Sequence, residues 1–177
     1  MKRMIGIASL LTVAAVAVTA CSTDYPVLST LAPAKVNFVA TLLGANEVPA
    51  VTTTAAGVMN LVREDSVSIL YTLSTTSATD SITMVHIHAG VAGANGPVMV
   101  WFFPTEASRA PGPGTGAAAR VNGVVRVGRI TRAGTAFVAP FTWDSLRVRL
   151  ANASAYVNLH TRQNPGGEIR GQVIAAP

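Results

Sequence analysis

The chain has 177 residues, half of them hydrophobic, and its thirteen Lys+Arg against eight Asp+Glu give a net charge of +5. A single cysteine excludes an intramolecular disulfide, and the length suits one domain core better than two. The basic residues are scattered rather than gathered in a stripe with interleaved aromatics, which excludes a typical nucleic-acid-binding surface.

Residues 1–20 have the three zones of an export signal. Lys2 and Arg3 precede an apolar run that is shorter than a comfortable membrane span and ends in small residues. The segment 18–21 (VTAC) resembles the lipobox of bacterial lipoproteins, in which the chain is cut before the cysteine and the thiol is acylated. We therefore expect a signal peptide over 1–20 and an exported protein held in a membrane by lipid on Cys21. The alternative is an ordinary secretory signal with a chance cysteine.

Residues 21–34 are the expected lipid-anchored linker, because two prolines and several polar residues leave no periodic pattern there. Resemblance to lipoprotein signals implies that Ser22, directly after the cysteine, favours the outer membrane or the cell surface. The remaining residues, 35–177, are expected to form one domain.

This region is rich in Val, Thr and Ala with frequent Gly and Pro, which is typical of short strands between turns. In one segment Val67, Ile69, Tyr71 and Leu73 alternate with mostly polar residues, which predicts one buried and one solvated face. The predicted strands are 35–43, 56–63, 66–74, 82–89, 97–103, 121–131, 155–161 and 168–175.

Two segments depart from this pattern. Residues 104–119 hold several Pro and Gly and predict a long loop. Residues 142–151 predict one short helix, with Thr142 as its N-cap and Trp143, Leu146 and Leu150 along one stripe. The predicted fold is therefore all-β: a single antiparallel β-sandwich, immunoglobulin-like or superoxide-dismutase-like, with one short helix.

Several blocks of the sequence resemble the CHRD domain, a family named after chordin and widespread in microbial exported proteins. They are 38–42 (FVATL), 44–49 (GANEVP), the strand around Tyr71, 86–90 (HIHAG), 93–98 (GANGPV), 155–161 (AYVNLHT) and 164–172 (NPGGEIRGQ). The resemblance covers about residues 36–175. It implies a β-sandwich-like module, and it implies no particular reaction.

All three histidines of the chain fall in these blocks. His86 and His88 are two residues apart on a strand, so their rings leave the same face, and His160 points away from the residues expected in the core. Two histidines at this spacing with a distant third are a recurring way to hold zinc or copper. The alternative is structural, with neutral imidazoles that hydrogen-bond between strands.

The C-terminal hairpin, residues 155–175, is expected to turn over residues 163–167. A register with His160 opposite Arg170 and Arg162 opposite Glu168 gives one polar face and one apolar face. Glu168 and Arg170 are expected to form a surface ion pair. The polar face is the expected functional surface, and it consists of Tyr156, Asn158, His160, Glu168, Arg170 and Gln172.

No catalytic residue can be assigned, since the sequence has no nucleophile elbow, phosphate loop or reactive cysteine. Glu47 is expected to play a structural role. The sequence favours a non-enzymatic module at the cell envelope that binds a protein, a glycan or an ion, including a metal ion held by the histidines. The alternative is a superoxide-dismutase-like copper/zinc protein with redox activity. A purely structural envelope component is a third possibility.

Overall fold

The computed structural model describes residues 35–79, 81–103, 121–135 and 137–177. The predicted signal peptide, Cys21, the linker and the 104–119 loop lie outside these residues. Among the residues that are described, no helix is both long and apolar enough to cross a membrane.

The described chain is all-β with one short helix, as predicted. The strands are β1 (Val36–Leu43), β2 (Ala56–Arg63), β3 (Ser68–Thr79), β4 (Ile82–Ala89), β5 (Val98–Phe103), β6 (Val121–Thr131), β7 (Ala155–Thr161), β8 (Ile169–Gln172) and β9 (Ile174–Ala175). A 3-10 turn, Gly44–Asn46, follows β1. The predicted strand over 168–175 is divided in two, because β8 pairs with β7 and β9 pairs with β1.

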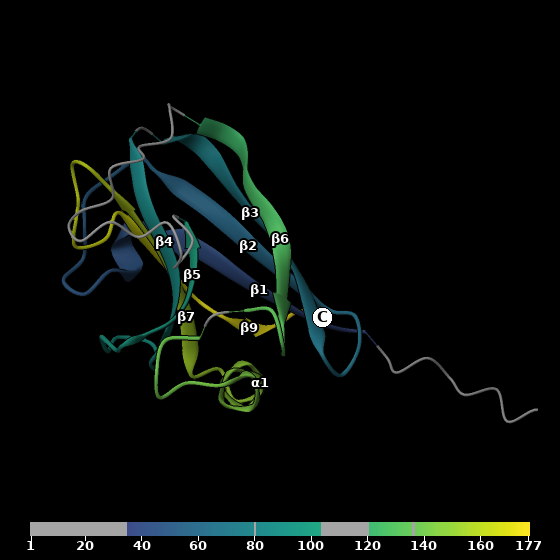
Figure 1. Ribbon diagram of the computed structural model, residues 1–177. Coiled ribbons are helices and arrows are strands. Elements are labelled where there is room, and N and C mark those ends of the chain that lie inside the picture. The colour runs from purple at the N-terminus through teal and green to yellow at the C-terminus, as the bar shows by residue number, and fades with distance from the viewer. Residues whose placement is uncertain (1–34, 80, 104–120, 136) are drawn as a thin grey trace, which may run out of the picture. The chain divides into compact units, whose positions relative to one another are not determined.

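The strands form one antiparallel sheet in the order β5-β4-β7-β8-β1-β2-β3-β6, with β9 added beside β1. The sheet curls so that its two halves face each other across the core (Figure 1). The rings of Tyr71 in β3 and Phe102 in β5 meet at 4.7 Å between centroids, although these strands lie far apart in the sheet order. The predicted sandwich is thus one folded sheet.

Alternating side chains supply the core, as the period of two predicts. Val85 and Ile87 in β4 and Val157 and Leu159 in β7 are fully buried. The predicted inward face around Tyr71 is confirmed except for Val67, which is 44% exposed. This residue precedes β3, whose first residue is Ser68, so the alternation of the strand does not extend to it.

The helix α1 (Trp143–Ala151) is also confirmed. Thr142 and Ser145 form a reciprocal capping box, and Asp144 occupies the first turn. The buried stripe is the predicted one, Trp143, Leu146 and Leu150. The indole of Trp143 donates a hydrogen bond to the carbonyl of Ser66 at 3.2 Å, which fastens the helix to the turn before β3.

Candidate metal centre

The structure brings the three histidines together. His86 and His88 lie on β4, and His160 lies on β7, the neighbouring antiparallel strand. His86 is paired with Asn158 in the ladder, so His160 sits diagonally beside it on the same face of the sheet. One ligand nitrogen from each histidine lies within 4.8 Å of the other two.

This face is the outer one, and the opposite face carries the core residues Val85, Ile87 and Leu159. His86 and His160 are nevertheless buried, with 3% and 7% of their surface exposed, and His88 is half-buried. Loops cover them. The loop after β4 reaches His88 through Gly96, and the loop after β7 reaches His160 through Pro165.

The hydrogen bonds of these loops fix which nitrogen is free. His88 Nδ1 lies 2.8 Å from the carbonyl of Gly96, and His160 Nδ1 lies 2.9 Å from the carbonyl of Pro165. A carbonyl only accepts, so each Nδ1 must carry the proton and each Nε2 keeps its lone pair. Both Nε2 atoms are buried and have no hydrogen-bond partner among the described residues.

The rings of His88 and His160 are neutral at neutral pH, because their pKa values are lowered. Burial lowers the pKa of His88 to about 4, against the opposing effect of the Gly96 carbonyl. Burial also lowers the pKa of His160, and the Pro165 carbonyl again opposes it. Neutral imidazole is the form that binds a metal, and an Nδ1–H donated to a backbone carbonyl is the usual outer-shell support of a metal-binding histidine.

His86 completes the cluster. Its ring centroid lies 4.9 Å from that of His160 and 5.3 Å from that of His88. Trp101 of β5 holds the ring edge-on at 3.9 Å. Nitrogens bound tetrahedrally to one zinc lie about 3.4 Å apart, so side-chain movements of roughly 1 Å would bring the three onto one ion.

The hairpin register differs from the predicted one. Asn158, not His160, pairs with Arg170, and Tyr156 pairs with Gln172. The turn is longer than expected, because the carbonyl of Asn164 accepts hydrogen bonds from the amides of both Thr161 and Gly167. The pairing changes by two residues, so the polar side chains still share one face.

The expected surface ion pair between Glu168 and Arg170 is wrong, because both side chains are buried in separate hydrogen-bond networks. Glu168 accepts hydrogen bonds from Thr53, Asn164 and Thr161. Burial raises the pKa of Glu168, but these three hydrogen bonds outweigh it and the pKa is lowered.

Arg170 is 2% exposed and holds the loop after β4. It donates to Asn95 Oδ1 at 3.0 Å and to the carbonyl of Ala94 at 2.5 Å. Its guanidinium lies 3.4 Å from the ring centre of Tyr156, which in turn stacks on His88. The polar hairpin face is therefore a buried layer that fastens loops, with only Gln172 partly exposed.

Sequence reasoning missed how closely Glu47 approaches this layer. Its carboxylate accepts hydrogen bonds from Asn158 Nδ2 at 2.7 and 2.9 Å, and the side chain is 8% exposed. Burial raises the pKa of Glu47 to about 7, while Arg170 and the Asn158 hydrogen bond oppose the shift. Pro49, two residues after Glu47, indicates a loop in the sequence but does not show where that loop lies in the fold.

A family model, described as the CHRD domain, matches residues 38–173. The matched range contains the three histidines, Glu47 and the strands β7 and β8. No curated protein and no solved structure gives a significant match to the chain.

Proposed function

Because the chain belongs to the CHRD domain family, we propose that its β domain is a non-enzymatic, envelope-displayed module that binds one zinc or copper ion through His86, His88 and His160. One observation carries the proposal. The rings of His88 and His160 each donate Nδ1–H to a backbone carbonyl and keep a buried Nε2 that has no hydrogen-bond partner in the described chain, and one nitrogen of each lies within 4.8 Å of a nitrogen of His86. An unpaired polar atom is costly in a buried site unless something binds it.

The role of the ion follows from what the ligands hold. His88 and His160 are tied to the loops after β4 and β7, and burial leaves little room for a substrate to approach. A bound ion would join two strands and two loops. Binding therefore fits this site better than turnover, and the loops it fixes are where an envelope protein or glycan would be recognised.

The test is metal content. The chain should be purified without chelators and with an affinity tag that contains no histidine, and its metal measured by inductively coupled plasma mass spectrometry. We expect about one equivalent of zinc or copper in the wild type and a loss of at least tenfold in a His86→Ala/His88→Ala variant. X-ray absorption should show nitrogen neighbours at about 2.0–2.1 Å.

Arg162→Ala is the matched control, because Arg162 is exposed beside the same turn and ligates nothing in the proposal. It should keep the wild-type metal content. Equal metal in the wild type and the double variant would refute the site, provided circular dichroism shows that the variant is folded.

The membrane anchor is a separate part of the proposal, and it rests on the sequence around Cys21. Mass spectrometry of the membrane fraction should give an N-terminal peptide that begins at an acylated Cys21. A Cys21→Ala variant should lack this modification, and its mature form should no longer be found in the membrane fraction. An unmodified, soluble N-terminus in the wild type would overturn the anchor and leave the metal site untouched.

A further inference from the structure

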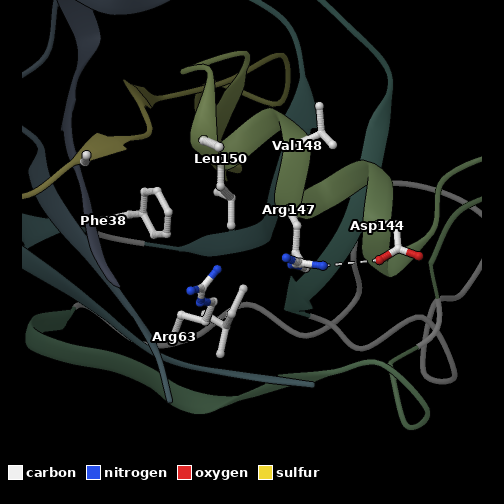
Figure 2. A pocket seen from close by; sticks show the side chains of 9 residues that line it. Phe38, Arg63, Asp144, Arg147, Val148 and Leu150 are labelled. Atoms are coloured by element: carbon white, nitrogen blue, oxygen red, sulfur yellow. Dashed lines mark ion pairs between the residues drawn. The ribbon is translucent and has the colours of Figure 1, made fainter. Parts of the chain in front are cut away.

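A pocket of about 460 Å³ lies between α1 and the end of the sheet formed by β1, β2, β3 and β9. Its walls are mostly apolar, with Phe38 from β1 and Leu150 from the helix facing each other (Figure 2). Ile69 is fully buried and Leu150 is 2% exposed, whereas Val148 at the rim is 62% exposed. The volume falls within the range of small-ligand sites.

Arg63 occupies a position in β2 where the alternation of the strand predicts an apolar residue. In β2, Met59 and Leu61 point into the core and are fully buried, and Arg63 is the next residue on that face. Arg63 pairs in the ladder with Ile69, which also lines the pocket. Figure 2 shows its guanidinium directed into the pocket below Phe38.

The acidic residue that lines the pocket, Asp144, already pairs with other arginines. Asp144 lies 3.5 Å from Arg147 and 3.7 Å from Arg132, in the distances between charged atoms. Arg63 makes no ion pair with any described residue. The lining thus carries two guanidinium groups against one carboxylate, so an apolar cavity has an excess positive charge that nothing in the described chain neutralises.

We propose that this pocket binds a small anionic amphiphile, a medium-chain fatty acid carboxylate, with its chain between Phe38 and Leu150 and its carboxylate on Arg63. The fork of an arginine matches a carboxylate in a bidentate manner. The apolar walls match the hydrocarbon chain. None of the lining residues belongs to the histidine cluster, so this inference stands apart from the metal site.

Photolabelling of the full chain in phosphatidylcholine vesicles tests the proposal. The probe is decanoate with an aliphatic diazirine in its chain, and labelled peptides are mapped by mass spectrometry. Labelling should fall on residues 143–151 and on the β1–β2 strands, and excess decanoate should compete it away. The matching diazirine decanol should label these peptides at least tenfold less, because it cannot use a charged hydrogen bond.

Three variants sharpen the result. Arg63→Gln should reduce labelling by decanoate at least tenfold, and Arg63→Lys should restore part of it. Arg149→Gln should leave it unchanged, since Arg149 is on the same helix but lies over Phe141, outside the pocket. Equal labelling by decanoate and decanol in the wild type, or labelling that does not concentrate on these peptides, would overturn the proposal even if Arg63→Gln failed to fold.

Discussion

At the scale of single residues, the outer face of β4, β7 and β8 is unusual because it is polar and yet buried. Glu47, from the loop after β1, contacts this face through Asn158, and burial raises the pKa of its carboxyl to about 7. A raised carboxyl pKa means that the folded protein prefers the protonated form. Its contribution to stability is fully present below the ordinary pKa of 4.5 and is lost as the pH rises through about 7.

A Glu47→Gln variant should therefore gain stability relative to the wild type as the pH rises. The difference in the free energy of unfolding should change by up to about 3 kcal/mol between pH 4.5 and pH 7.5. Urea unfolding of both proteins, with chelator present, measures it. The lowered pKa values of His88 and His160 make the folded protein less stable as the pH falls. This effect is common to both proteins and cancels in the difference between them. A difference that is flat with pH would show that Glu47 ionises normally.

Substitution of Arg170 tests whether the buried polar side chains of β7 and β8 stabilise the fold. Arg170→Met keeps much of the side-chain volume but removes the donors to Asn95 and Ala94 and the cation over Tyr156. We expect a loss of at least about 3 kcal/mol in unfolding free energy, because the hydrogen bonds of a charged group and its contact with an aromatic ring are removed and the loop after β4 loses its attachment. Amide exchange should quicken in residues 90–97.

Arg162→Met serves as the comparison for this experiment. Arg162 is exposed, so its replacement should cost less than about 0.5 kcal/mol. Similar losses in the two variants would mean that Arg170 contributes no more than an ordinary surface arginine.

At the scale of elements, β8 joins the two halves of the sheet. It pairs with β7 along four residue pairs and with β1 through Leu43 and Arg170. At Gly171 the backbones of β8 and β1 approach closely, because a Cβ on this residue would lie 2.4 Å from the carbonyl oxygen of Thr41 in β1.

Gly171→Ala should therefore push β8 away from β1 and destabilise the domain by about 2–4 kcal/mol. Thermal unfolding followed by circular dichroism measures the loss. Gly166→Ala in the same hairpin is the control, since a Cβ there meets no atom within 4 Å. If the two alanine variants unfolded at the same temperature, the β1–β8 contact would be looser than the structure shows.

Elements were the part of this fold that sequence could predict. Alternation in β4 and β7 and the capping residue Thr142 are local signals, and each placed its element correctly. The hairpin register was missed by two residues, because it depends on how Asn164 closes the turn and on Glu168 binding Thr53 far away in sequence. Local pattern carries no information about such distant partners.

At the scale of the whole molecule, the local sequence pattern could predict only part of the candidate site, because the site joins residues that are distant in sequence. Alternation placed His86 and His88 on one face of their strand and His160 away from the core, and the structure puts all three on the outer face of the sheet. Their convergence depends on β4 and β7 being neighbours, although more than sixty residues separate them along the chain. The burial of the cluster depends on loops that fold back over it. Neither follows from the histidine spacing alone.

Metal binding at such a site should be visible in the stability of the entire domain. An ion held by β4 and β7 binds the folded chain and not the unfolded one, so zinc at a thousand times its dissociation constant should add about 4 kcal/mol. For a domain of this size that is a rise in Tm of roughly 10 °C. Differential scanning calorimetry of the chelator-treated chain, with and without zinc or copper, measures it. The His86→Ala/His88→Ala variant should show no rise and Arg162→Ala should show the full rise. If neither zinc nor copper changed the Tm of the wild type, the three histidines would have a structural role alone.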